Sequence, residues 1–349
     1  HGNRRMIERI ITFGARRRVA TFILLALLSA LSLWQVPNIQ VDTSYDSLMR
    51  QKDPARLEYD KVVAQFGSDN TTIVYLRARD LFTRERLAAI DRLTTELQNL
   101  DGVTRVESLF TIRNVRGETG DLETGPLLDG VPADAAGLAA ARANALRSPL
   151  ALGTLISGDG TVTAVNVTVA SESGDQSFNR AFRTRVDALT EPLRREFDEI
   201  FQIGPPRLNS DIEQAMFADL SVLTPLSTLL ILICLVVMMR LWLGAVVPML
   251  SAGLSILWTF GFMGAMGFPL TILTAIVPSL VIVIGCAEDT HMISEYMHGV
   301  SRKLDRMPAI RFMARKIGVP ILINSATTAL GFFTNAISDI TLIVQFSYV

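Results

Sequence analysis

The sequence predicts a polytopic α-helical membrane bundle with a separate α+β domain between the first and second spans. The 349 residues are 49% hydrophobic and 19% charged. These charges are segregated, because residues 241–287 contain no Asp, Glu, Lys or Arg. A run of that length exceeds the ~20 residues that cross a bilayer once. Residues 42–219, in contrast, have the mixed composition of a water-soluble domain.

The first span is expected at residues 19–36, directly after a basic segment. Residues 1–18 carry several arginines, and their apolar residues are spaced along one helical face. We expect a cytoplasmic basic amphipathic segment on the membrane surface; a disordered basic tail that only sets topology is the alternative. The apolar run is long for a signal peptide, and residues 35–38 do not form a small-residue cleavage site, so we expect an uncleaved helix.

The other spans are expected after the α+β domain. The apolar runs predict spans at residues 220–239, 243–263, 270–292 and 317–338, and the start of a sixth span at residues 340–349. Gly261, Gly264, Gly267 and Pro269 mark the expected turn between the third and fourth spans, because glycine and proline interrupt helices.

Lysines and arginines near the span ends predict the orientation. They are concentrated in residues 1–18, at Arg240 and in a basic loop at residues 294–316, whereas the short connections on the opposite side contain none. Short loops rich in Lys and Arg stay in the cytoplasm. We therefore expect a cytoplasmic N-terminus and an outward-facing domain at residues 37–219.

The domain is expected to contain two sets of strands and helices on one mainly antiparallel sheet. The first set is a strand at 71–76, a helix at 83–100 and a strand at 103–109. The second is a hairpin of strands at 152–156 and 161–170, a helix at 176–197 and a strand at 200–203. A glycine-rich excursion at 117–136 and a short helix at 138–146 connect the two sets. The first helix carries its apolar residues at the period of one buried face, at Leu87, Ile90, Leu93 and Leu97.

Several function classes are disfavoured by composition. Residues 37–219 contain neither His nor Cys, so this domain cannot form a His-based triad or an imidazole or thiolate metal site. We expect no enzyme, no catalytic residues, no metal and no cofactor. The formal net charge of −1 leaves no basic excess for nucleic acid. Cys234 and Cys286 both lie in apolar runs and suggest no disulfide framework.

Two adjacent acids, Glu288 and Asp289, interrupt the expected fourth span. An ionised acid at the bilayer centre costs at least ~2.5 kcal/mol, so such residues normally face a bundle interior and mark ion transfer. Counted from Leu270, however, Asp289 lies near the cytoplasmic boundary, where it would merely end the span. A later turn, or a bend at Pro278, would place the pair deeper. We expect a transport role and keep the boundary acid as the alternative.

These residues resemble the RND superfamily, and within it the MMPL, hopanoid-exporter and Patched-like branch. The layout of one span, a large domain and a group of spans is similar to that of the family. Gly285-x-x-x-Asp289 resembles the family's glycine followed by a relay aspartate. The stretch at residues 320–333, with its proline, threonine pair and Gly-Phe, resembles the family's fifth span.

The resemblance covers the whole chain and implies an N-terminal half with a periplasmic α+β domain of the ferredoxin-like, porter type. It implies a proton relay formed by Asp289, Glu288 and Thr290, and helix packing beside the relay by Gly285, Thr327 and Thr328. The second acid of some family members follows the aspartate, whereas Glu288 precedes it. Because the chain stops within the expected sixth span, we expect a truncated chain rather than a half supplied separately.

The implied function is export of a lipid or other hydrophobic molecule from a bacterial inner membrane, driven by the proton-motive force. The expected partners are that hydrophobic substrate, protons, membrane lipids, the second half of the transporter, further copies of the chain and a periplasmic protein. One alternative is a membrane protein that senses lipid or sterol or assists assembly, without transport. Another is a protein-translocation auxiliary of the SecD/SecF type.

Overall fold

The computed structural model describes residues 8, 11–44, 54–68, 70–118, 121–170, 175–239 and 242–349. The chain forms two compact units, each described here by itself. The helical unit comprises residues 1–42, 47–52 and 213–349, and the α+β module comprises residues 43–46 and 53–212. Most of the expected basic amphipathic segment at residues 1–18 lies outside the described residues.

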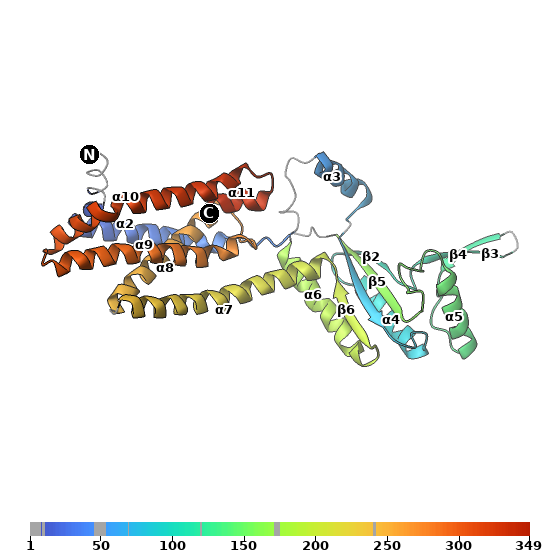
Figure 1. Cartoon of the computed structure of the whole chain (residues 1–349). Coiled ribbons are helices and arrows are strands. Elements are labelled where there is room, and N and C mark those ends of the chain that lie inside the picture. Colours follow the sequence, from blue (N-terminus) through green and yellow to red (C-terminus); the bar gives the residue numbers. More distant parts are fainter. Residues whose placement is uncertain are drawn as a thin grey trace. The chain divides into compact units, whose positions relative to one another are not determined.

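The helical unit is built from long apolar helices (Figure 1). Its helices are α2 (Arg18–Gln35), α8 (Trp242–Met266), α9 (Val277–Ser301), α10 (Arg306–Phe333) and α11 (Thr341–Tyr348), with the 3-10 turns η1 (Val36–Asn38), η4 (Thr274–Ile276) and η5 (Thr334–Ile337). Helix α7 (Pro205–Met239) begins in the module and continues into this unit. Within the described residues, five helical segments are long and apolar enough to cross a membrane: Arg18–Asn38, Pro205–Met239, Gly244–Met266, Thr274–Ser301 and Arg306–Ile337. The predicted mostly helical architecture with several candidate spans is thereby confirmed.

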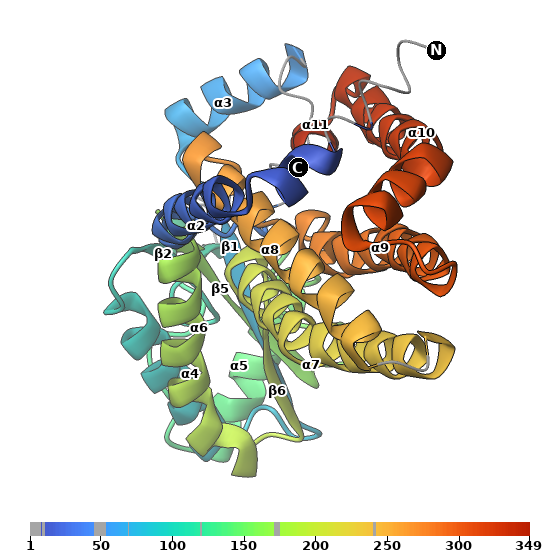
Figure 2. The same cartoon turned by 90° about the vertical axis from the view of Figure 1, so that its left-hand side faces the viewer.

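Within this unit α2 packs against α8, α8 against α9, and α9 against α10, as the end-on view of the helices in Figure 2 shows. A small buried cluster joins α7, α8 and α9 and consists of Leu235, Ala245, Ala252, Ile282 and Cys286. Helix α2 has no buried residue. A helix that is apolar on all sides is suited to contact with lipid.

Two glycines of α8 allow α2 to approach closely. A Cβ atom at Gly261 would collide with Ser32, and one at Gly264 would collide with the backbone carbonyl of Gln35. The indole Nε1 of Trp258 also donates to Ser29 Oγ at 3.1 Å. Small residues permit such contacts between membrane helices. Gly261 and Gly264 were expected to mark a turn, but the helix runs through both of them to Met266.

The turn that follows α8 lies at Gly267. This residue has φ +71°, and the Phe268 amide donates to the Met263 carbonyl at 2.9 Å, which is the way glycine typically ends a helix. Helix α9 then begins at Val277, later than the expected start at Leu270, and ends at Ser301. The expected basic loop at residues 294–316 is therefore mostly helical, and only residues 302–305 separate α9 from α10.

The α+β module is organised around one four-stranded sheet. Its strands are β1 (Thr71–Arg77), β2 (Val103–Glu107), β5 (Val162–Val169) and β6 (Glu199–Ile203), and their order is β2-β5-β1-β6 with every neighbouring pair antiparallel. Its helices are α3 (Pro54–Phe66), α4 (Arg84–Gln98), α5 (Ala135–Arg147) and α6 (Gln176–Thr190), followed by the 3-10 turn η3 (Glu191–Arg195). Cross-strand pairs such as Val74 with Val165 fix the register.

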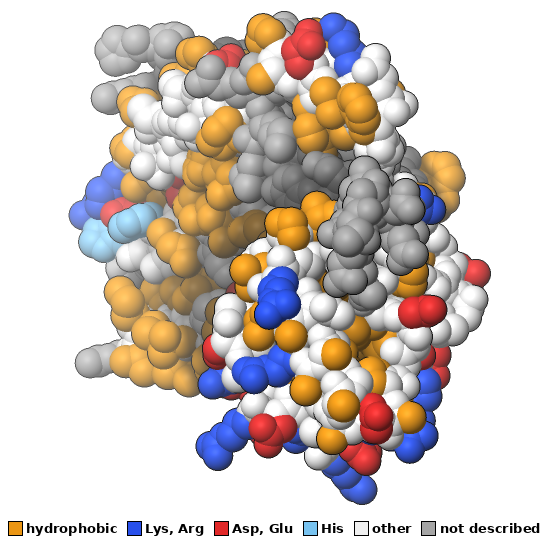
Figure 3. Space-filling model, turned by 90° about the vertical axis from the view of Figure 1, so that its right-hand side faces the viewer, with side chains coloured by type: hydrophobic (Ala, Val, Ile, Leu, Met, Phe, Trp, Pro, Cys, Tyr) orange, Lys and Arg blue, Asp and Glu red, His pale blue; other side chains and the backbone are white. Residues whose placement is uncertain are grey.

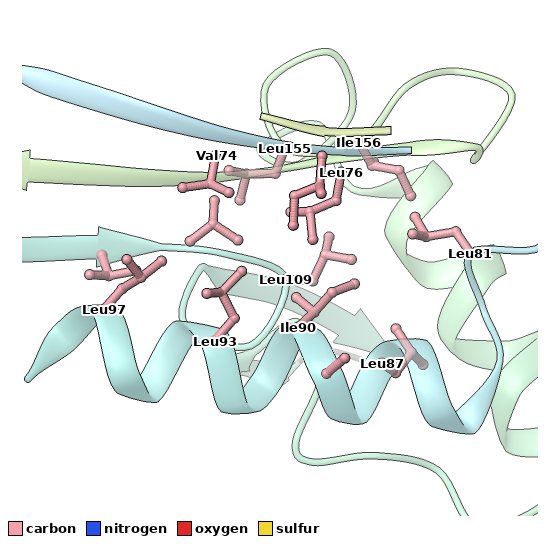
Figure 4. Packing of buried hydrophobic residues seen from close by; sticks show 14 of the residues in the cluster. Val74, Leu76, Leu81, Leu87, Ile90, Leu93, Leu97, Leu109, Leu155 and Ile156 are labelled. Atoms are coloured by element: carbon pink, nitrogen blue, oxygen red, sulfur yellow. The ribbon is translucent and has the colours of Figure 1, made fainter. Parts of the chain in front are cut away.

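The core of the module lies between this sheet and its helices. Figure 4 shows the buried side chains of α4 pointing toward those of the sheet. The four expected α4 residues, Leu87, Ile90, Leu93 and Leu97, are among them, and each is at most 1% exposed. Helix α4 begins with Thr83, whose side chain accepts from the Arg86 amide and thereby satisfies one of the free amides of the first turn. The predicted helix and its buried face are confirmed.

Three segments of the module differ from the expected pattern. The excursion at residues 117–136 contains part of a hairpin, β3 (Arg113–Glu118) with β4 (Asp121–Pro126). The expected strand at residues 152–156 forms only isolated bridges, between Leu152 and Ile156 and between Ile156 and Thr163. The expected helix at residues 176–197 ends at Thr190 and is followed by η3.

Charged side chains of the module form a network between α6 and the first turns of α7. Arg207 contacts Asp187 at 2.6 Å and Asp211 at 2.9 Å, and Arg183 contacts Asp211 at 2.9 Å. The two arginine side chains are about a quarter exposed, at 26% and 22%. Networks of this kind hold elements together better than single exposed pairs do.

The charged surface of the module is mixed in sign. The face seen in Figure 3 carries acidic and basic side chains interspersed rather than a patch of one sign.

Candidate functional site

The two expected acids lie at the middle of α9. Asp289 is the central residue of the helix, equally far from Val277 and from Ser301. The preceding residues 242–287 of the helical unit contain no charged side chain. The depth of Asp289 in a bilayer stays a prediction, because the second half of α9 carries polar residues such as Glu295 and extends beyond the uncharged run.

Asp289 and Gly285 face helix α8. The Ser251 hydroxyl of α8 lies near the Asp289 side chain. A Cβ atom at Gly285 would lie 4.0 Å from the Ala252 Cβ, so α8 and α9 pack closely one turn before the acid. Asp289 Oδ2 is shielded from solvent and has no hydrogen-bond partner among the described residues. A shielded, unpartnered carboxylate oxygen is costly when the group is ionised.

Glu288 faces helix α10. Asn324 Nδ2 donates to Glu288 Oε1 at 2.9 Å. Ser325 Oγ lies 2.9 Å from Oε1 and 3.2 Å from Oε2. The two adjacent acids therefore contact different neighbouring helices, because consecutive residues of an α-helix point about 100° apart.

The other expected site residues lie on the same helices but have other partners. Thr290 Oγ1 donates to the Cys286 carbonyl at 2.6 Å, within α9. Thr327 Oγ1 donates to the carbonyls of Ile323 and Asn324, both at 2.9 Å and both within α10. Thr328 follows it on α10. The structure thus joins α9 to α10 through Asn324 and Ser325 rather than through the threonine pair.

Three contacting residues were missed in the sequence, namely Ser251, Asn324 and Ser325. Asn324 and Ser325 carried a signal, because they are polar residues in the uncharged run that forms the membrane part of α10. Ser251 is one of several small polar residues in α8 and has no comparable signal. What the sequence lacks is the identity of the helices that flank α9.

A cavity lies between α9, α10 and α11. Its volume is about 490 Å³. Its lining is almost entirely apolar and includes Val277, Leu280, Val281, Ile284, Ala329, Leu330, Phe332, Phe333 and Phe346. Ile284 lies one turn before Glu288 on α9, and Ala329 lies one turn after Ser325 on α10. The cavity thus ends near the polar contact between these helices. Such apolar cavities with a few polar groups are typical of binding sites for small molecules.

Metal chemistry has no obvious place at the acids. The described part of the chain contains no group of three or more His, Cys, Asp or Glu side chains that could hold a metal ion. The chemistry that two neighbouring carboxyl groups can carry out is proton uptake and release, together with hydrogen bonding to the flanking helices.

Apolar candidate spans, a mixed α+β module and an acid pair at the centre of one helix define a polytopic membrane protein with an ionisable site in its helical unit. The profile of the MMPL family matches residues 49–349, and the chain belongs to this family, which is part of the RND superfamily. Members of the family are membrane transporters rather than enzymes.

One relative is similar over nearly the whole chain. It is the protein MJ1562 of Methanocaldococcus jannaschii, whose name describes it only provisionally as a membrane protein. The two sequences are 21% identical over 342 residues, which cover 94% of this chain and 84% of the relative. The name of this relative agrees with the assignment of this chain to a membrane and specifies no substrate.

Proposed function

We propose that this chain belongs to a proton-driven exporter that moves a lipid or another hydrophobic molecule outward, and that Asp289 takes up and releases the proton. The observation that carries the proposal is the setting of Asp289. The residue is central in a candidate span, it faces the uncharged helix α8, and its Oδ2 atom is shielded and has no hydrogen-bond partner in the described part of the chain. Intramembrane acids in such settings mark ion pathways.

Neutralisation of Asp289 would change the packing of α9 against α8. An ionised carboxylate in apolar surroundings is unfavourable without a partner, whereas the neutral acid can also donate a hydrogen bond. Protonation therefore stabilises one arrangement of the two helices over another, and a ligand that binds one state better shifts the equilibrium toward that state. In this proposal Thr290 remains a relay candidate beside Asp289.

A hydrophobic cargo is supported by the family and by the apolar cavity beside α9. The α+β module supports a porter-type role. Its chain order β1-α4-β2-β5-α6-β6, with the sheet order β2-β5-β1-β6, agrees with a ferredoxin-like domain. We propose a periplasmic position for the module and a bacterial inner membrane for the helices, on the basis of the Lys and Arg distribution. A second half-transporter and a periplasmic protein are the proposed partners.

A non-transporting lipid sensor is the alternative that the same cavity favours. Asp289 separates the two functions, because a sensor needs the apolar cavity but no proton exchange. The test uses full-length protein in phospholipid vesicles with an enclosed pH-sensitive dye and a short-chain fluorescent phospholipid as the probe. We expect Asp289→Asn to abolish both the proton flux and the probe movement that an imposed pH gradient drives.

The control is Asp129→Asn, which changes an exposed acid of the module and is expected to leave both signals unchanged. Signals in Asp289→Asn equal to those in this control would refute the proposed role of Asp289, and the absence of both signals from the unaltered protein would favour the sensor.

A further inference from the structure

Glu288 and Asp289 differ in how completely their carboxyl oxygens are satisfied. Both oxygens of Glu288 lie within hydrogen-bonding distance of Ser325 Oγ, and Oε1 also accepts from Asn324. Asp289, in contrast, has one oxygen that is shielded and finds no hydrogen-bond partner among the residues that the structure describes. Hydrogen bonds from uncharged donors to a carboxylate favour its ionised form and are stronger than bonds between neutral groups.

The donors of Glu288 come from a different helix than the neighbours of Asp289. Asn324 and Ser325 belong to α10, whereas Ser251 belongs to α8. An ionised Glu288 therefore joins α9 to α10 through two side chains. A neutral Glu288 would hold α10 less strongly, because hydrogen bonds to an uncharged carboxyl group are weaker than those to a carboxylate.

We propose that the two acids have separate tasks: Glu288 stays ionised and anchors α9 to α10 through Asn324 and Ser325, while Asp289 alone exchanges the proton. The inference rests on the proposed function of Asp289. Glu288, Asn324 and Ser325 are thereby positioning residues. They keep one side of α9 fixed, so that the movement caused by protonation takes place at the contact with α8.

No other charged group competes for the two acids on the described helices around them. Helix α8 carries no ionisable side chain, and α10 carries none from Ile317 to Phe333. On α9 itself, Glu295 is paired with Lys316 at 2.8 Å. His291 and the buried thiol of Cys286 are the other titratable groups of this part of α9. The charge that Asp289 experiences most directly is therefore that of Glu288.

The test is infrared difference spectroscopy of the full-length protein in phosphatidylcholine vesicles between neutral and acidic pH, because it needs no cargo. A protonated carboxyl group and a carboxylate absorb at different frequencies. We expect the carboxyl band of the membrane acid to be lost in Asp289→Asn and to be retained in Glu288→Gln. In the double variant Asn324→Ala with Ser325→Ala, we expect an additional carboxyl band, since Glu288 has lost its donors and can bind a proton.

Thr334→Ala is the matched control, because it removes a hydroxyl group from the candidate span that also contains Ser325. Thr334 Oγ1 donates to the Gly331 carbonyl and not to either acid. This variant should leave the spectrum unchanged and should show that the extra band is not a general effect of packing. An unchanged spectrum in Ser325→Thr, which keeps the hydroxyl, would support the anchor.

The outcomes distinguish this inference from the proposed function. Loss of the band in both Asp289→Asn and Glu288→Gln would overturn the division of tasks and leave proton exchange at the site intact. Absence of an additional band in the double variant would also overturn it. A band that persists in Asp289→Asn would instead refute the proposed function, and the inference with it.

Discussion

Asp159 organises the turn before β5 with a single carboxylate. Ser157 Oγ donates to its Oδ1 at 2.5 Å, and the Thr161 amide and hydroxyl donate to Oδ1 and Oδ2 at 3.1 and 2.8 Å. The Ser157 hydroxyl and the Thr161 donors lower the pKa of Asp159 from 3.8 to about 2. Local hydrogen bonds of this kind are typical of Asp in turns.

This carboxylate predicts a pH dependence of stability. Because the pKa is lower in the folded state than in the unfolded chain, the stabilising effect is complete above pH 3.8 and is lost as the pH falls through about 2. We expect Asp159→Asn to lower the resistance of the module to unfolding at neutral pH, and the difference from wild type to disappear in that acidic window. Urea unfolding followed by circular dichroism at several pH values measures this.

Asp129→Asn serves as the control, since Asp129 is an exposed loop residue. An Asp159→Asn chain that unfolds like wild type at neutral pH would contradict the role of the turn.

The sequence identified the ionisable residues of the helical unit but not all of their contacts. Glu288 and Asp289 were evident because acids are rare in apolar runs. Their different neighbours depend on which helices pack against α9, and this information is absent from the pattern of a single helix. For the same reason the threonine pair was expected beside the acids, whereas Asn324 and Ser325 make the contact.

At the scale of elements, the contact between α2 and α8 depends on glycine. Because a Cβ atom at Gly264 would meet the Gln35 backbone, we expect Gly264→Val to destabilise this contact by about 1 to 3 kcal/mol, the usual cost of overpacking. Thermal unfolding of the purified protein in detergent measures the loss. Gly253→Ala on the same helix is the matched control, because no atom lies within 4 Å of its added Cβ. Equal unfolding temperatures for both variants would argue against close packing of these helices.

The start of α9 shows how a local signal can be overlooked. Pro278 was considered as the cause of a bend, but it lies in the first turn of the helix, where proline is favoured because no amide is needed. The reciprocal hydrogen bonds of Thr271 and Thr274, at 2.7 and 3.2 Å, organise the segment just before it. Pro278 was therefore a signal for the start of the helix in the sequence. With the start placed there, Asp289 would have been expected well inside the helix rather than near its end.

At the scale of the whole molecule, the proposed orientation places the module outside and the turn between α9 and α10 inside. We expect an impermeant thiol reagent to label Asp129→Cys in intact cells and to label Lys303→Cys only after the membrane is opened. Both variants are made in a chain with Cys234 and Cys286 replaced by Ala. Mass spectrometry of the labelled protein measures the result. If Lys303→Cys were labelled in intact cells and Asp129→Cys were not, the orientation would be the opposite of the proposed one.

The overall architecture could be predicted because it depends on composition. Segregated charges indicated the spans, and the apolar period of residues 84–98 indicated the main core helix. The order of the strands could not be derived, since it is set by pairings between distant segments such as β1 with β6. The hairpin of β3 and β4 was also missed, because its glycine-containing sequence has no clear alternation.

The position of β1 in the sheet has a consequence for biosynthesis. This strand is the first of the sheet to leave the ribosome, yet its two neighbours, β5 and β6, are the last strands to be made. One edge of β1 can pair only after residues 162–169 have been translated and the other only after residues 199–203, and pairings over such distances form slowly. Helix α7 begins at Pro205, so the sheet can close only as the second candidate span is being synthesised. Because β6 leads directly into α7, closure of the sheet and membrane insertion of this helix follow one another as the same stretch of chain is synthesised.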